Sequence, residues 1–254
     1  MNQDENTAID HKAQSISRSI SQPPADLQAQ LHQIVNELSL VKLKLPDLPE
    51  DTPISLWLLS PDMPPLSVHD ERVTRLWQNT PYWSFCWASG LAMARVILGC
   101  PELVAGKTVI DFGAGSAVVG IAAKLAGAKR VIACDLDPVS LLAAKHNAEL
   151  CGVTLEYLSD ISELEKPADL LLAADVLYDL CNRPLLDRFL SWAKSSVVAD
   201  SRVRDFKHSD FTTCGRLESS TWPDLDESAE FRQVNFYASQ GLDLWKMSLD
   251  KLSD

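Results

Sequence analysis

Short apolar segments alternate with helical segments over residues 107–199, and this alternation constrains the fold more than any other feature of the sequence. The segments that predict strands are 108–112, 130–134, 154–158, 169–174 and 196–199. The segments that predict helices are 116–127, 138–151 and 185–194, with Pro138 at a first turn and a glycine after two of the ends. Strands joined by helical crossovers form a parallel sheet that is covered on both faces. We therefore predict an α/β fold with a doubly wound, Rossmann-like sheet.

Two more apolar segments, 231–237 and 242–247, lie near the C-terminus. Both are short enough to be strands, and the few residues between them suit a tight connection. We predict that they form a C-terminal antiparallel strand pair.

The N-terminal part of the chain has a different composition. Residues 1–24 are polar and rich in Ser and Gln, which predicts a disordered tail. Over residues 26–42 an apolar stripe that includes Leu27, Leu31 and Leu38 predicts an amphipathic helix, with Asp26 as its cap, that docks on its own domain or on a partner. Three prolines in residues 46–53 predict a linker. Residues 25–53 are therefore expected to be a helical extension and a linker, and residues 54–254 the main domain, beginning with a strand at 54–59.

The charge and the apolar pattern limit the partners of this chain. The net charge is −12 and the pI is near 4.8, which disfavours nucleic acid, since binding phosphates requires Lys and Arg, and suits a basic protein substrate. No apolar run approaches the roughly 20 residues that a membrane helix needs. The acidic start lacks the pattern of a secretory or mitochondrial leader. We therefore expect a cytoplasmic protein without a membrane partner; nothing in the sequence indicates its oligomeric state.

Cysteine and histidine usage gives no sign of a metal site. The six cysteines contain no Cys-x-x-Cys pair, and the five histidines are scattered without the spacing of ligands or of a catalytic triad. We therefore predict no bound metal and no disulfide framework, and we expect mostly buried, reduced thiols.

A glycine loop follows the first predicted strand of the sheet. It reads Asp111-Phe-Gly113-Ala-Gly115-Ser and leads into a predicted helix. Two glycines allow the backbone to turn sharply and to approach a ligand without a Cβ clash. Ligands of doubly wound sheets bind at the carboxyl ends of the strands, where the positive end of the next helix also lies. The loop therefore predicts a nucleotide-like ligand.

Two details of this loop separate S-adenosylmethionine from a dinucleotide. The dinucleotide fingerprint requires a third Gly or Ala three places after the second glycine, and Val118 stands there. Asp111 is awkward beside a pyrophosphate but suits a ligand that carries an ammonium group. We therefore predict S-adenosylmethionine as the cofactor, with an NAD-dependent dehydrogenase as a distant alternative.

Acidic residues follow the next two predicted strands. Asp135 lies about two dozen positions after the glycine loop and is placed to accept hydrogen bonds from both ribose hydroxyls. Asp137 precedes Pro138 and predicts a helix cap. Asp160 is either an acceptor for the adenine amino group, with Ile161 packed on the ring, or a turn residue.

The fourth predicted strand ends in Asp175-Val-Leu-Tyr178, at the edge where an acceptor would meet the methyl group. The Asn/Asp-Pro-Pro-Tyr/Phe motif of enzymes that methylate amide or exocyclic amino nitrogens is absent. A carboxylate can orient an amine and help to deprotonate it, and an aromatic face can hold its cationic forms. We therefore predict catalytic roles for Asp175 and Tyr178; a strand-end turn with a packed tyrosine is the alternative. The aromatic segment 81–90 is either core or a lid beside the cofactor.

Taken together, these motifs resemble the seven-strand, class I methyltransferases, and more narrowly the family that methylates lysine on the β subunit of electron-transfer flavoprotein. The resemblance covers roughly four-fifths of the chain, from 54–61 through Pro81-Tyr82-Trp83, the glycine loop and Asp135-Leu-Asp137-Pro138 to Asp175-x-x-Tyr178. It departs at Trp87-Ala-Ser-Gly90, where the family often has Trp-Pro-Gly-Gly, and at Ala117, where the superfamily has a third glycine.

The resemblance implies S-adenosylmethionine as methyl donor and a protein lysine as acceptor. The residues that it places on the cofactor side are Trp83, Asp111, Gly113, Gly115 and Asp135, and those on the acceptor side are Asp175 and Tyr178. Related chains are also described as nicotinamide N-methyltransferases, so a small amine stays open as the acceptor. A member that binds cofactor or partner without catalysis is the remaining alternative, and the intact loop and Asp175 argue against it.

Overall fold

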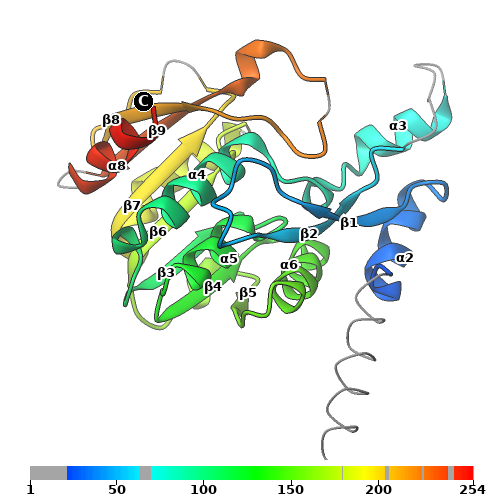
Figure 1. Cartoon of the computed structure of the whole chain (residues 1–254), viewed down its shortest axis with the longest axis horizontal. Helices are drawn as coiled ribbons and strands as arrows, with labels where there is room; N and C mark the ends of the chain where they lie inside the picture. Colours follow the sequence, from blue (N-terminus) through cyan, green and yellow to red (C-terminus); the bar gives the residue numbers. More distant parts are fainter. Residues whose placement is uncertain are drawn as a thin grey trace, which may run out of the picture.

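A seven-stranded sheet with helices on both faces forms the body of the protein in the computed structural model (Figure 1). The structure describes residues 22–62, 70–178, 180–203, 206–224, 226–239 and 243–253. The strands, in their order across the sheet, are β5 (Glu156–Leu158), β4 (Arg130–Cys134), β3 (Thr108–Phe112), β6 (Ala168–Ala174), β7 (Ala193–Asp200), β9 (Gln233–Ser239) and β8 (Phe211–Glu218). The predicted α/β fold and its seven strands are confirmed.

The strand order contains one reversal, which marks the place for a ligand. The chain runs from β3 to β4 to β5 and then returns to β6 on the other side of β3. Strands β5, β4, β3, β6 and β7 are parallel, whereas β9 is antiparallel to both of its neighbours. In a sheet of this kind, ligands bind where neighbouring connections leave in opposite directions, here at the carboxyl ends of β3 and β6.

The helices cover the sheet because alternate strand residues point to opposite faces. The helices are α4 (Ala88–Gly99), α5 (Val118–Leu125), α6 (Pro138–Leu150), α7 (Leu186–Trp192) and α8 (Asp243–Ser253). Val109 of β3 packs in one cluster with α4, α5 and α8, while its neighbour Ile110 packs in the opposite cluster with α7. The predicted cap Asp137 is confirmed, because its Oδ1 accepts a hydrogen bond from the Val139 amide at 2.9 Å.

The prediction of an antiparallel pair between 231–237 and 242–247 is wrong in its second member. Strand β9 pairs with β8, and α8 begins at Asp243. Trp245 and Leu249 are both buried and lie four residues apart, the spacing of one face of a helix. The apolar alternation within 242–247 resembles that of a strand and hides this spacing. Strand β8 escapes prediction because a register shift between Thr213 and Gly215 breaks its alternation of buried and exposed residues.

The predicted helix over 26–42 is also too long. Helix α2 covers Ala25–Ile34, and β1 (Leu40–Lys44) pairs antiparallel with β2 (Ser55–Leu59) in a separate two-stranded sheet. The side chain of Gln28 holds the turn between α2 and β1. It donates a hydrogen bond to the Leu38 carbonyl at 2.9 Å and accepts one from the Leu40 amide at 2.8 Å. The predicted linker over 46–53 is the connection of this hairpin.

The predicted cap of α2 is wrong as well. Pro24 occupies the cap position and makes no side-chain hydrogen bond there, whereas Asp26 lies in the first turn. The Asp26 carboxylate instead lies 3.0 Å from Nε2 of His146 on α6. Most of the predicted polar tail, residues 1–21, lies outside the described residues.

Helix α2 docks on its own domain. Leu27 and Leu31 are fully buried in a cluster with Trp57 and Trp83, next to α6 (Figure 1). None of the helices in the described part of the chain combines the length and the apolar character that crossing a membrane requires.

We expect Leu31→Ala to lower the free energy of unfolding by about 2–5 kcal/mol, because it leaves a cavity in this cluster. Gln33→Ala on the exposed side of the same helix is the matched control and should change it by less than about 0.5 kcal/mol. Chemical denaturation of both variants measures the difference. Equal stability of the two variants would show that α2 contributes nothing to the fold.

Candidate active site

The glycine loop connects β3 to α5 and is tied to the end of β4. The amides of Gly113 and Ala114 both donate to the Cys134 carbonyl, at 2.8 and 3.1 Å. Gly113 has a φ of 69°, and a Cβ at this position would lie 2.8 Å from Cγ1 of Val176, so only glycine fits. Gly115 has a φ of 50°, and a Cβ there would meet no atom closer than 4.0 Å. The loop is therefore packed on its β6 side and open at Gly115.

Asp111 braces the helix that follows the loop. Its side chain is buried, and its Oδ2 accepts a hydrogen bond from the Gly120 amide of α5 at 2.8 Å. Burial, together with the negative charge of Asp135, raises the pKa of Asp111 to about 7. The ionisation of Asp111 therefore depends on its burial and on the charge of Asp135.

Asp135 links the glycine loop to the start of α6. Its Oδ2 accepts from the Gly115 amide at 2.9 Å, and its Oδ1 accepts from the Asp137 amide at 3.0 Å. Burial raises the pKa of this carboxyl too. An ionised carboxylate can accept about four hydrogen bonds, so capacity remains for a ligand. The next side chain, Leu136, is 82% exposed, which is unusual for leucine at a strand end.

Asp160 is a turn residue, which is one of its two predicted alternatives. Its Oδ1 accepts from the Ser162 amide at 2.8 Å and caps the short 3₁₀ turn η3 (Ile161–Glu163). This hydrogen bond holds the pKa of Asp160 below its usual value. Ile161 is buried against the sheet. The role of Asp160 toward adenine stays a prediction.

Asp175 joins three elements at the end of β6. Its carboxylate accepts from the amide and hydroxyl of Ser89 on α4, at 2.9 and 2.7 Å. It also accepts from the amide and hydroxyl of Ser201, at 3.0 and 2.8 Å. The residue is 8% exposed and has a φ of 50°. Four donors occupy this carboxylate, so the geometry favours a role in positioning the site.

The two aromatic motifs meet in space. Tyr82 and Tyr178, from segments almost a hundred residues apart, have ring centroids 5.5 Å apart, and the Trp87 ring lies 5.8 Å from that of Tyr82. Tyr82 and Tyr178 are 44% and 52% exposed, so these rings are not core. We call Tyr82, Trp87 and Tyr178 the aromatic trio. The guanidinium of Arg202 lies 5.6 Å from the Trp87 ring.

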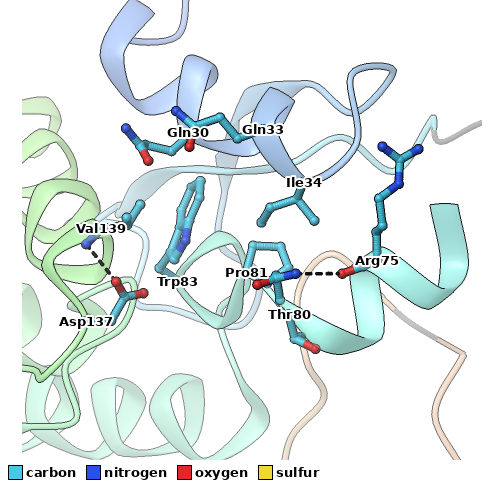
Figure 2. A pocket seen from close by; sticks show the side chains of 10 residues that line it. Gln30, Gln33, Ile34, Arg75, Thr80, Pro81, Trp83, Asp137 and Val139 are labelled. Carbon is cyan, nitrogen blue, oxygen red and sulfur yellow. Dashed lines mark hydrogen bonds between the residues drawn. The ribbon is translucent and has the colours of Figure 1, made fainter.

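Trp83 lies apart from the glycine loop. It is 2% exposed and stands between α2 and α6, where it lines a pocket of about 420 Å³ (Figure 2). The polar residues that line this pocket are Gln30, Gln33, Arg75, Asn79, Thr80 and Asp137. Among the residues that the structure describes, Trp83 is the only predicted cofactor-binding residue that lines this pocket. The other predicted residues gather at the carboxyl ends of β3, β4, β5 and β6.

Sequence reasoning missed several residues of the site. Ser89 and Ser201 carry no signal in the sequence, because only the fold brings them to Asp175. Asp200, which accepts from the amides of Arg202 and Val203, is fully buried, and its pKa rises to about 6 through burial and the charge of Asp175. Within the described ranges, no three His, Cys, Asp or Glu side chains are grouped to hold a metal.

Comparisons with known proteins find similarity to methyltransferases. The family model for the ribosomal protein L11 methyltransferase (PrmA) matches residues 101–191. The electron transfer flavoprotein beta subunit lysine methyltransferase of Homo sapiens is 37% identical over 123 residues, which are 47% of this chain and 46% of that protein. The ribosomal protein L11 methyltransferase of Aeromonas hydrophila is 52% identical over 66 residues, 26% of this chain and 21% of that protein. The match therefore spans less than half the length of either relative.

A solved structure extends the likeness to most of the chain. The T. thermophilus 16S rRNA N2 G1207 methyltransferase, in complex with AdoMet and guanosine, has a TM-score of 0.50 at 12% identity, and the likeness covers 80% of this chain and 50% of that one. At this identity the likeness shows the fold. The strand order and this likeness show that the chain has the seven-strand fold of that methyltransferase.

Proposed function

We propose that this protein is an N-methyltransferase that takes its methyl group from S-adenosylmethionine and transfers it to a lysine side chain of a partner protein. The observation that carries the proposal is that the glycine loop, Asp135 and Tyr178 of the aromatic trio all lie at the carboxyl edge of the sheet, after β3, β4 and β6. The named activities of the partial relatives support it.

The charges around the glycine loop fit this cofactor. Asp111 and Asp135 both have raised pKa values, and the charge of Asp135 contributes to the shift at Asp111. Anionic charge without a matching cation favours a ligand with a positive charge, and it disfavours the pyrophosphate of NAD. The open side of Gly115 leaves room for the backbone to approach such a ligand.

The residues that would hold S-adenosylmethionine lie around this loop. Asp135 would accept from the ribose hydroxyls, and the exposed side chain of Leu136 would lie against the adenine, with Asp160 near its amino group. When bound, this cofactor supplies a methyl group on a positively charged sulfur. The loop backbone at Gly113–Gly115 and the charge of Asp111 would favour the methionine end. Trp83 would hold the 81–83 segment in place, because its ring is buried next to α2 and α6.

On the acceptor side, the aromatic trio would hold the amine and exclude water. Methyl transfer is an in-line displacement, so alignment of the nucleophile and removal of water supply much of the catalysis. Aromatic faces bind ammonium and methylammonium groups by cation–π attraction. Asp175 would fix the end of β6, and therefore Tyr178, relative to α4. The lysine ammonium would lose its proton to solvent before it enters, so that the neutral amine acts as the nucleophile.

Asp135→Ala is expected to weaken S-adenosylmethionine binding by at least about 100-fold, because two charge-assisted hydrogen bonds to the ribose are lost. Asp137→Ala removes the neighbouring helix cap and is the matched control, with an expected change below about fivefold. Isothermal titration calorimetry of both variants measures the affinities. A wild-type protein that binds NAD tightly and S-adenosylmethionine not at all would contradict the proposal.

Tyr178→Ala is expected to lower kcat about 10- to 100-fold while the affinity for S-adenosylmethionine changes less than about threefold, because the ring contacts the acceptor and not the cofactor. Tyr178→Phe keeps the ring and should retain most of the activity. Single-turnover transfer from a radiolabelled donor gives the rates. Equal loss in both variants would assign the role to the hydroxyl group instead of the ring.

A small amine such as nicotinamide is the second candidate acceptor. Two rings of the trio, Tyr82 and Tyr178, are exposed and would suit either acceptor. Incubation of a cell lysate with labelled donor distinguishes the two, because label then enters either the protein fraction or the small-molecule fraction.

A further inference from the structure

The pocket beside Trp83 adjoins the aromatic trio on one side, and on the other it reaches Asp137, whose amide donates to Asp135. Thr80 and Pro81 line the pocket, and Tyr82, the next residue, belongs to the trio. The 3₁₀ turn η1 (Tyr82–Ser84) directs successive side chains to different sides, so Trp83 faces the pocket while Tyr82 faces Tyr178. Consecutive Cα atoms lie 3.8 Å apart, so the backbone of Pro81, which lines the pocket, directly adjoins that of Tyr82 in the trio.

The lining of the pocket suits a peptide. Six of its ten lining residues are polar, whereas pockets for small molecules are mostly apolar. Gln30, Gln33 and Asn79 are amides, which both donate and accept and therefore match the alternating N–H and C=O groups of a peptide backbone. Ile34, Trp83 and Val139 supply apolar contacts for its side chains (Figure 2).

The pocket also carries a cation. Arg75 lies in the last turn of α3 (Glu71–Gln78), and among the described residues its guanidinium has no ion-pair partner. Arg72 on the same helix differs, because Asp70 and Glu37 neutralise it. Arg75 is exposed, and although its charge helps to lower the pKa of Asp70, no carboxylate forms an ion pair with it within the described ranges, so its guanidinium can bind a carboxylate of the ligand.

We infer that this pocket binds the acceptor protein through the residues that flank the methylated lysine, with an acidic side chain of that segment facing Arg75. The inference rests on the proposed function and adds the recognition of sequence around the target. An extended peptide advances about 3.3 Å per residue, so the acidic side chain would stand a few positions from the lysine.

An array of 13-residue peptides with a central lysine and one varied flanking position tests this inference, with the full chain and a radiolabelled donor. The wild-type protein should prefer Asp or Glu over Lys or Arg by about fivefold at a position a few residues from the target. Arg75→Glu should invert this preference. Lys129→Glu, with the same charge change at an exposed site at the start of β4, should leave it unchanged.

Fluorescence anisotropy of a labelled acidic-flank peptide, with S-adenosylhomocysteine present, gives a readout besides activity. Arg75→Glu should weaken binding of this peptide about fivefold, and calorimetry should show unchanged affinity for S-adenosylmethionine. A preference that persists in Arg75→Glu, or no transfer to any peptide by a wild-type protein that binds S-adenosylmethionine, would overturn the inference while leaving the cofactor proposal intact. A wild-type protein that does not bind S-adenosylmethionine would instead overturn the proposed function.

Discussion

Replacement of Asp175 by alanine is expected to lower the free energy of unfolding by about 3–5 kcal/mol, and the melting temperature by about 10 °C. The reason is that four donors, two each from Ser89 and Ser201, lose their acceptor in a buried place. Alanine is also strained at a φ of 50°. Calorimetric melting measures the effect.

The matched variant is Asp175→Asn. Asparagine tolerates this backbone conformation and keeps one acceptor oxygen, but its amide nitrogen faces one of the donors. We expect an intermediate loss of stability. If Asp175→Ala melted like the wild type but had lost methyl transfer, Asp175 would act on the acceptor directly and our positioning role would be wrong.

Replacement of Asp111 by asparagine is expected to stabilise the free protein above pH 8 and to weaken cofactor binding. The folded protein raises the pKa of Asp111 from 3.8 to about 7, so the folded state binds more protons than the unfolded state between these values. The stability that this group contributes is therefore complete below pH 4 and is lost as the pH rises through 7. Asparagine cannot ionise, and its oxygen can still accept from the Gly120 amide, so the variant avoids this loss.

The size of the effect follows from the pKa. We expect the variant to be about 2–4 kcal/mol more stable than the wild type at pH 8, or about 5–10 °C in melting temperature, with the difference vanishing toward pH 4. Melting curves across this pH range measure it. A constant difference at all pH values would show that Asp111 does not titrate in this window.

Cofactor affinity should change with pH in the opposite direction to stability. A cationic ligand favours ionised Asp111, so S-adenosylmethionine should bind the wild type about tenfold more tightly at pH 8 than at pH 6. S-adenosylhomocysteine lacks the sulfonium charge and should show a weaker dependence. Asp111→Asn should bind S-adenosylmethionine weakly and without this pH dependence, which calorimetry at both pH values would show.

The parallel half of the sheet could be predicted from the sequence because its strands are buried on both faces. Val109 and Ile110 face opposite clusters, so β3 is an unbroken apolar run bounded by turn residues. The glycine loop could be predicted for a related reason, because the positive φ of Gly113 and its close approach to Val176 leave no other residue possible.

The missed elements depend on contacts between distant residues. The register shift in β8 removes its alternation, and the closeness of α8 at Gly215 belongs to the tertiary structure. Leu38 extends the apolar stripe of α2, but the helix has already ended at Ile34. Leu38 is buried because it leads into β1, which packs in the same cluster. Likewise, the four hydrogen bonds to Asp175 come from residues 86 and 26 positions away.

Methyl transfer to protein is the central claim, and the most direct measurement uses S-adenosylmethionine with a labelled methyl group. The full-length protein is incubated with this donor and a dialysed cell lysate, and the precipitated protein is hydrolysed and separated into amino acids. We predict label in methylated lysine with the wild type and background label with Asp135→Ala. Label confined to small molecules, or no transfer by a wild-type protein that binds the donor, would contradict the account.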